Sequence, residues 1–199
     1  MSDLEGKVVL ITGTARGCGQ VLAEAFAGAG AEVVACDRDA EAGAQVAERI
    51  RAAGGEIDFS HADVSVEGEV ERLVPKAIDR HRRLDVAVNN AGTESTAQPA
   101  AGTEAAFDDL IANNLKGLFF CLKHEIAAMR SGGGGAIVNM SSVTSSMTAV
   151  PAEQLATSFP VGHMGRPEEL VAAVMYLSSD EARYCTGTTL VLDGGYTAQ

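Results

Sequence analysis

The chain has little positive charge and no long apolar run, and these two shortages exclude several classes of protein. It has 15 lysines and arginines against 27 aspartates and glutamates, which gives a formal net charge of −12. Nucleic acids and anionic membrane surfaces are bound through basic patches, so we expect neither as a partner. No apolar stretch approaches the roughly 18 residues that a membrane span requires. The polar segment Met1–Lys7 does not have the character of a secretory leader.

Cysteine and histidine are sparse, and neither stands in a metal-ligand or redox spacing. The four cysteines, Cys18, Cys36, Cys121 and Cys185, form no C-x-x-C pair, and each stands where a small apolar side chain is expected. The four histidines show no ligand spacing among themselves or with the cysteines, so we expect no metal site. We interpret all four cysteines as buried, reduced thiols of a cytoplasmic protein.

A glycine-spaced turn follows the first apolar run, Val8–Thr12. It reads Gly13-Thr14-Ala15-Arg16-Gly17-Cys18-Gly19. The glycines permit a sharp turn at the first position, close backbone approach to a pyrophosphate at the second, and tight helix–strand packing at the third. A helix that begins here directs its N–H groups and positive dipole end toward phosphates. This order of strand, glycines and helix predicts a dinucleotide site.

Asp37 ends the second apolar run, 33–36. An acid at this position accepts hydrogen bonds from the adenosine ribose and repels a 2′-phosphate, so we predict NAD as the cofactor. Arg16 and Arg38 flank the position, which leaves some tolerance of NADP open. The alternative interpretation is that Asp37 is a solvated acid at the end of a strand.

Short apolar runs alternate with amphipathic stretches along the chain, which is typical of a parallel sheet covered by helices. The 199 residues are 46% hydrophobic and 21% charged, as in a globular domain of ordinary size. We predict an α/β fold, a Rossmann-type doubly wound parallel sheet flanked by helices, as a single domain over 1–199. Strands are expected at 7–12, 32–36, 56–60, 84–88, 136–140 and 188–192, and helices at 17–28, 40–53, 66–81, 104–130 and 167–178. Pro75 is expected to kink its helix or limit it to its first half.

Ordered motifs over nearly the whole chain resemble those of classical short-chain dehydrogenases/reductases. The turn matches the family's T-G-x-x-x-G-x-G, and the later matches are Asp63-Val64, Asn89-Asn90-Ala91-Gly92, Asn114-Leu115-Lys116-Gly117, Ile137–Ser142, and Thr186-Gly187 through Asp193-Gly194-Gly195. The resemblance implies NAD-dependent hydride transfer to or from a small alcohol or ketone substrate. It also implies a homo-oligomer, either a dimer or a tetramer.

Two residues receive catalytic roles from this resemblance. Ser142 would hydrogen-bond the oxygen of the substrate. Asn114 would distort its helix and hold a water of the proton relay, with the adjacent Asn113 as the alternative for this role. Asparagine is disfavoured inside a helix without such a purpose.

Further residues receive cofactor-binding roles. Asp63 would meet the adenine amino group with Val64 beside the ring, but Asp63 suits the N-cap of the following helix about equally well. The small residues of Asn90-Ala91-Gly92 would let the backbone pass close to the ribose and nicotinamide. Asn89 is expected to bond across to neighbouring strands.

One motif of the family is absent from the chain. Tyr-x-x-x-Lys is expected roughly thirteen residues after Ser142, but Leu155 and Phe159 stand there, and the last lysine is Lys123. Family members run roughly fifty residues longer, and the resemblance breaks near 151–152. We expect that a block with the catalytic pair and a sixth strand belongs to the protein, because 188–192 would otherwise leave buried backbone groups unpaired. The alternative is a real deletion, which leaves a catalytically inactive dinucleotide-binding protein.

Overall fold

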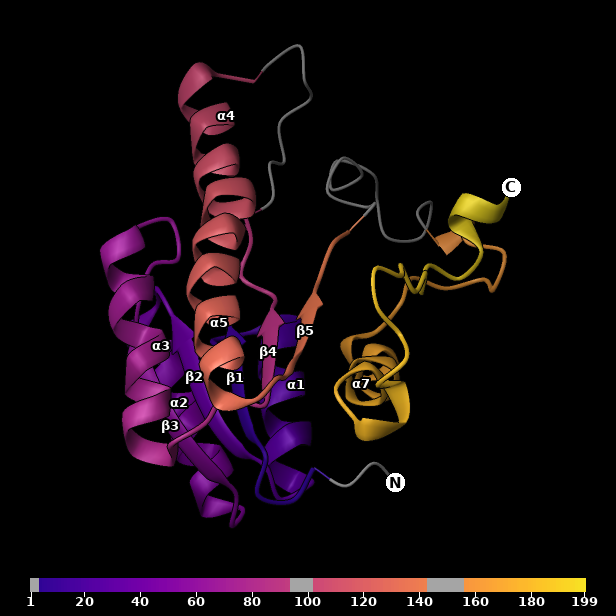
Figure 1. The fold of residues 1–199 in the computed structure, drawn as a ribbon. Helices are drawn as coiled ribbons and strands as arrows, with labels where there is room; N and C mark the ends of the chain where they lie inside the picture. Colours follow the sequence, from indigo (N-terminus) through magenta and orange to yellow (C-terminus); the bar gives the residue numbers. More distant parts are fainter. Residues whose placement is uncertain (1–3, 94–101, 143–155) are drawn as a thin grey trace.

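A computed structural model describes residues 4–93, 102–142 and 156–199, and its centre is a parallel five-stranded sheet (Figure 1). The strand order is β3-β2-β1-β4-β5, with every neighbouring pair parallel. The order reverses between β1 and β4, which confirms the predicted doubly wound, Rossmann-type sheet. The strands are β1 (Val8–Thr12), β2 (Glu32–Asp37), β3 (Glu56–His61), β4 (Val86–Asn89) and β5 (Ala136–Asn139).

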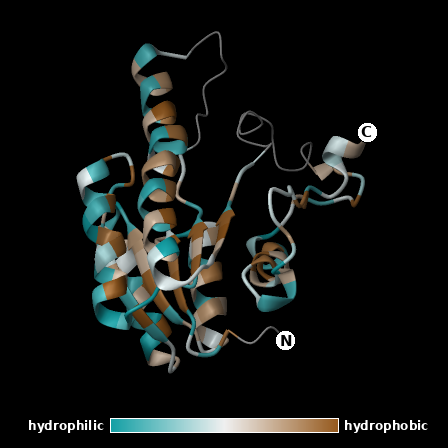
Figure 2. Ribbon diagram, in the orientation of Figure 1, coloured by the Kyte–Doolittle hydropathy of each residue, from teal (hydrophilic) through white to brown (hydrophobic). Residues whose placement is uncertain are grey.

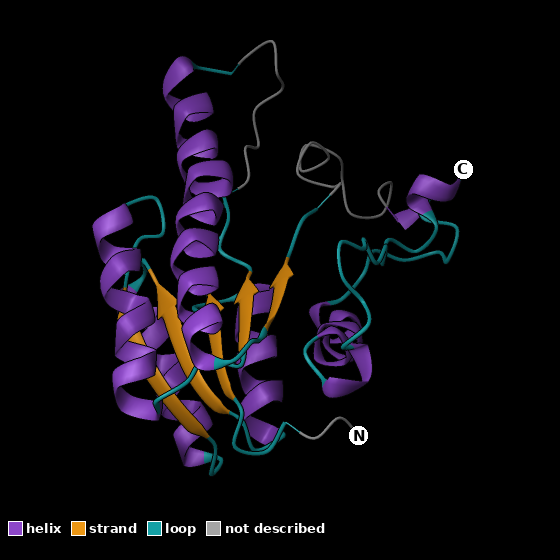
Figure 3. Ribbon diagram, in the orientation of Figure 1, coloured by secondary structure: helices purple, strands orange, loops and turns teal. Residues whose placement is uncertain are grey.

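The helices follow the expected alternation with the strands (Figure 3). They are α1 (Gly17–Gly28), α2 (Ala40–Ala52), α3 (Glu67–His81), α4 (Glu104–Leu110), a π-helical segment (Ile111–Gly117), α5 (Leu118–Gly132) and α7 (Pro167–Leu177). Short 3-10 turns lie at Asp180–Ala182 and Tyr196–Ala198. The α3 helix runs through Pro75 to His81, so the proline does not limit it to its first half.

The sheet divides the core into two apolar layers. Successive strand residues point to opposite faces, so Val9 and Ile11 of β1 pack into one layer and Val8 and Leu10 into the other. The first layer contains side chains of α1, α2 and α7, and the second contains side chains of α3 and α5. In Figure 2 the central strands are largely brown, as burial on both sheet faces requires, and teal and brown residues alternate along the helices.

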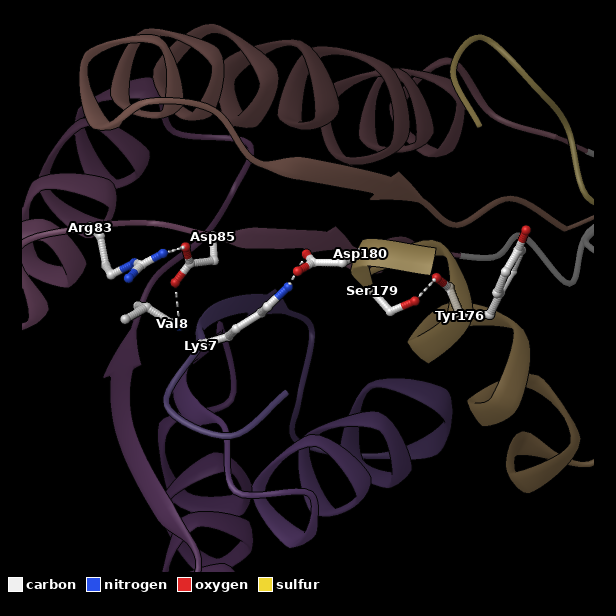
Figure 4. Close-up of polar contacts among 7 residues, drawn as sticks. All are labelled: Lys7, Val8, Arg83, Asp85, Tyr176, Ser179 and Asp180. Atoms are coloured by element: carbon white, nitrogen blue, oxygen red, sulfur yellow. Dashed lines mark hydrogen bonds and ion pairs between the residues drawn. The ribbon is translucent and has the colours of Figure 1, made fainter. Parts of the chain in front are cut away.

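Helix α7 is anchored to the beginning of β1. Val174 of α7 lies in the first core layer, and Lys7 Nζ donates to Asp180 Oδ1 at 2.6 Å just beyond the helix (Figure 4). Nearby, Asp85 Oδ2 accepts from the backbone N–H of Val8 at 2.9 Å. The segment after α7 is thereby held at the end of the sheet opposite to the carboxyl ends of the strands.

One expectation about secondary structure is wrong. Residues 188–192 form no strand, and Leu190, Val191 and Leu192 are 47–57% exposed. A strand requires a hydrogen-bonded neighbour, and within the described part of the chain β5 is the last strand of the sheet on that side. The helix expected at 104–130 is present and continues to Gly132, and its π-helical segment contains Asn114, where a distortion is expected. None of the helices within the described ranges is long and apolar enough to cross a bilayer.

Candidate cofactor and active site

The turn after β1 has the geometry that its glycines predict. Gly13 and Gly17 have φ angles of +74° and +60°, a region that side chains disfavour. A Cβ on Gly13 would lie 2.8 Å from the Cα of Ala91, and one on Gly19 would lie 1.9 Å from the carbonyl oxygen of Gly13. Glycine is therefore required at the first and third positions by close backbone packing.

The beginning of α1 offers a cradle for an anion. The N-cap residue, Arg16, makes no side-chain hydrogen bond to the first turn, and this turn contains no acidic residue. A Cβ on Gly17 would meet no atom within 4 Å, so the space above the turn is open. The positive end of the helix dipole and the first N–H groups, which have no partner within the helix, therefore lie at an open turn.

An open pocket of about 690 Å³ lies beside this cradle, at the carboxyl ends of β2 and β3. Asp37 is oriented there by two backbone amides: Oδ2 accepts from Ala15 N at 2.8 Å and Oδ1 from Asp39 N at 2.9 Å. Each carboxylate oxygen keeps a further lone pair for a ligand hydroxyl. The residues that line the pocket are Arg16, Asp37, Arg38, Asp39, Ala40, His61, Asp63, Val66 and Glu69.

Asp63 and Val64 have different surroundings. Asp63 lines the pocket, and its Oδ1 accepts from Ser65 N at 2.8 Å. The N-cap of α3 is Val66, so the N-cap alternative for Asp63 is wrong and its side chain instead closes a local turn. Val64 is buried in the second core layer, against Gly117, on which a Cβ would lie 2.9 Å from Val64 Cγ2.

The loop after β4 is bound to the turn after β1 through Thr12. Thr12 Oγ1 accepts from the N–H groups of Asn90 and Ala91 at 3.1 and 3.0 Å. In return, Asn90 Nδ2 donates to the carbonyl oxygens of Thr12 and Gly13, both at 3.0 Å. Thr12 is buried, and sequence reasoning missed its role because a threonine inside an apolar strand gives no distinct signal.

Asn114 lies in the π-helical segment and reaches the same loop. Its Oδ1 accepts from Thr93 N at 2.8 Å and its Nδ2 donates to Thr93 O at 2.9 Å. Gly92 leaves room for this contact, since a Cβ there would lie 3.3 Å from Asn114 Oδ1. Asn113 instead bonds Asp109 within its own helix, so Asn114 is the asparagine that contacts the loop.

Ser142 follows β5 on the same edge of the sheet. The last residues of β4 and β5, Asn89 and Asn139, are paired in register, so the segments that leave these strands begin side by side. Ser142 is exposed and comes three residues after Asn139. The positions expected for Tyr-x-x-x-Lys begin at Leu155, which lies outside the described residues together with 143–154.

One buried acid near this edge was not anticipated. Glu125 of α5 is fully buried, and its Oε2 accepts from Asn89 Nδ2 at 2.9 Å. Burial raises the pKa of Glu125 to about 7, and the hydrogen bond from Asn89 offsets only part of this effect. His61 and Glu69, which line the adjacent pocket, were also not predicted as site residues. In the sequence nothing distinguishes them from other polar residues of the protein surface.

Comparison with known proteins gives consistent matches over the whole chain. Residues 7–156 match a family model described as short chain dehydrogenase, and residues 151–197 match one described as Enoyl-(Acyl carrier protein) reductase. An uncharacterized oxidoreductase of Thermotoga maritima is 30% identical over 251 aligned positions, which cover 98% of this chain and 99% of that protein. A 3beta-hydroxysteroid dehydrogenase 1 of Eggerthella lenta is 32% identical, with 98% and 95% covered.

A solved structure agrees with these relatives. The crystal structure of a short-chain dehydrogenase/reductase from Burkholderia xenovorans superposes with a TM-score of 0.87 at 31% identity, covering 100% of this chain and 99% of that one. Fold, motif order and sequence similarity therefore agree, and the chain belongs to the short-chain dehydrogenase family, a family of oxidoreductases.

Proposed function

We propose that this protein is an NAD-dependent oxidoreductase that transfers a hydride between nicotinamide and an alcohol or ketone carbon. The observation that carries the proposal is the convergence of three features at one edge of the sheet. These are the glycine turn Gly13–Gly19, the uncapped beginning of α1, and the carboxylate of Asp37. Together they match the phosphates and the adenosine ribose of a dinucleotide.

We propose NAD rather than NADP because Asp37 lies where the 2′-oxygen of the ribose would be bound. Its two oxygens are held by Ala15 N and Asp39 N, so the carboxylate cannot easily turn away from a 2′-phosphate. Arg16 and Arg38 line the same pocket and would reduce the resulting repulsion without removing it. The proposed cofactor contacts are Gly13, Arg16, Gly17, Cys18, Gly19, Asp37, Arg38, Asp63, Val64, Asn90, Ala91 and Gly92.

When bound, the nicotinamide ring supplies the site that gives or receives the hydride. The residues of the chain act around it. We propose that Ser142 donates a hydrogen bond to the substrate oxygen, at the edge where parallel sheets bind ligands. Asn114 holds the Gly92–Thr93 backbone through both ends of its amide, and its remaining lone pair and N–H are available to a water of a proton relay.

Hydride transfer also requires a group that gives or takes the proton, and we propose that a tyrosine and lysine from a missing block supply it. The alignment with the Thermotoga relative runs over 251 positions, 52 more than the 199 residues of this chain. The two family models meet within 151–156, near the proposed position of the block. The exposed apolar segment 188–192 supports the same interpretation, because it lacks the neighbouring strand that the block would provide.

The second candidate function is cofactor binding without catalysis. It is favoured by one observation, the absence of any lysine after Lys123, which leaves the 199 residues without the catalytic pair. In this case the chain would still bind NAD through its first two strands and α1. Both candidates share the same cofactor site and differ in the proton-transfer group.

We further propose a small-molecule substrate, a homo-oligomer and a cytoplasmic location. A small alcohol or ketone is supported by the name of the Eggerthella relative, a hydroxysteroid dehydrogenase. Self-association is supported by four exposed apolar side chains of α4, the π-helical segment and α5, namely Phe107, Leu115, Phe119 and Ile126. A reducing compartment is supported by the buried free thiols of Cys36 and Cys121. The expectation that all four cysteines are buried is wrong for Cys185, which is exposed, and for Cys18, which is only partly buried.

Intact mass and turnover, measured on the protein from its natural source, test the proposal. An active enzyme should weigh several kilodaltons more than the 20.5 kDa of these residues and should oxidise NADH with members of a ketone panel. A mass of 20.5 kDa with NADH binding but no turnover supports the binding protein instead. Absence of NADH binding overturns both.

A further inference from the structure

Glu125 is a carboxyl group enclosed in the protein between α5 and the sheet. Its relative exposure is 0%, although α5 carries exposed side chains such as Phe119 and Ile126 on another face. Enclosing a carboxyl group in an apolar layer is unfavourable unless its oxygens find partners. Such a residue therefore requires a physical explanation.

Its contacts join the ends of two strands. Asn89, the last residue of β4, donates through Nδ2 to Glu125 Oε2 at 2.9 Å and to Asn139 Oδ1, at the end of β5, at 3.0 Å. Both partners are acceptor oxygens, so the amide of Asn89 must direct its nitrogen toward them. Glu125 thus fixes the orientation of a side chain that bridges β4 and β5.

Two buried acceptors of this cluster have no hydrogen-bond partner within the described ranges, Glu125 Oε1 and Asn89 Oδ1. An apolar residue at position 125 would avoid the free-energy cost of burying Glu125 Oε1 without a hydrogen-bond donor. Burial raises the pKa of Glu125 to about 7, which agrees with a carboxyl group that is only partly compensated. The cluster is therefore not the arrangement that core packing alone would favour.

The two strand ends lead directly into the proposed site. Asn89 precedes the loop Asn90–Gly92, and Asn139 precedes Ser142. We propose that Glu125 is a positioning residue: through Asn89 it sets the ends of β4 and β5, and hence the nicotinamide half of the cofactor site. This inference rests on the proposed function, because it assigns those two segments to the nicotinamide half.

The binding of two ligands, NADH and AMP, distinguishes a positioning role of Glu125 from a general effect of its substitution on the fold. The residues that line the adenosine pocket all lie between positions 16 and 69, on β2, β3 and the segments after β1, β2 and β3, so none of them belongs to β4 or β5. Glu125→Leu removes the acceptor of Asn89 Nδ2 and should weaken NADH binding about tenfold, with AMP binding changed by less than about twofold. Glu125→Gln keeps an acceptor oxygen and should retain NADH affinity within about twofold.

Calorimetric titration of both ligands into the wild type and the two variants decides the matter. Selective loss of NADH affinity in Glu125→Leu, restored in Glu125→Gln, supports the inference. Unchanged NADH affinity, or equal losses for NADH and AMP, overturns it while the proposed function stands. A wild type that binds neither ligand overturns both.

If Glu125→Leu does not fold, Asn139→Ala provides the same test. It removes the second acceptor of Asn89 Nδ2 from the exposed end of β5. It should weaken NADH binding about threefold and leave AMP binding unchanged. Equal affinity of this variant and the wild type for NADH overturns the inference.

Discussion

The free energy of unfolding should fall as the pH rises toward neutrality, and Glu125→Gln should remove this fall. Burial raises the pKa of Glu125 from 4.5 to about 7 in the folded protein. The folded state therefore holds a proton that the unfolded state releases, so the stability due to this proton is lost as the pH rises through that range. At 1.36 kcal/mol per pKa unit, the loss amounts to about 3 kcal/mol by about pH 8.

Two asparagines and two cysteines that the described residues place near Glu125 do not change charge between pH 4.5 and about 7. Asn89 and Asn139 face it from β4 and β5 and are neutral. Burial raises the pKa of Cys36, on β2, to about 12, and it also raises the pKa of Cys121, on α5. Both thiols stay protonated near neutrality, so Glu125 is the member of this cluster whose charge changes there.

Urea unfolding followed by circular dichroism at about pH 5.5 and about pH 8.5 measures the effect. Between these two values the wild type should lose about 2 kcal/mol more stability than Glu125→Gln. Glu48→Gln, which replaces an exposed carboxyl group on α2, is the control and should follow the wild type. Equal pH dependence of the wild type and Glu125→Gln would refute the reasoning.

Three further predictions concern the cofactor site. Asp37→Ala should weaken NADH binding by about 10- to 100-fold, because a charged hydrogen-bond acceptor is lost, and it should reduce the preference for NADH over NADPH. An unchanged preference for NADH in fluorescence titrations would show that Asp37 is not part of the site. Gly19→Ala places a Cβ 1.9 Å from a backbone oxygen and should abolish NADH binding in the same titration, whereas Gly28→Ala, with nothing within 4 Å of its Cβ, should bind normally. Thr12→Val leaves two backbone amides of the loop after β4 without their acceptor and should destabilise the protein by about 1–3 kcal/mol in urea unfolding; a stability equal to that of the wild type would contradict this role.

The sheet and its flanking helices could be predicted because their signals are local. The apolar runs that became β1 and β2 are bounded by glycines and by Asp37, and the structure ends each strand within a residue or so of the prediction. The turn at Gly13–Gly19 could be interpreted for the same reason, since φ angles and close backbone contacts restrict those positions to glycine. Asn114 was found through its motif, and the structure adds that its partner is Thr93.

The features that were missed depend on contacts between distant segments. Glu125 follows His124 on an amphipathic helix, where a glutamate normally indicates a solvated surface, and only the packing of α5 on the sheet shows that it is buried. Thr12 gains its role from a loop 78 residues further along the chain. Residues 188–192 have the composition of a strand, but a strand forms only beside a partner, which the described residues do not provide.

The central claim is that the turn after β1, the beginning of α1 and Asp37 together bind a nicotinamide dinucleotide. Isothermal titration calorimetry of the 199-residue chain with NADH and, separately, with NADPH tests it most directly. We expect saturable heat with NADH at one site per chain and weaker binding of NADPH. Absence of heat with both nucleotides, from a chain that circular dichroism shows to be folded, would contradict the claim.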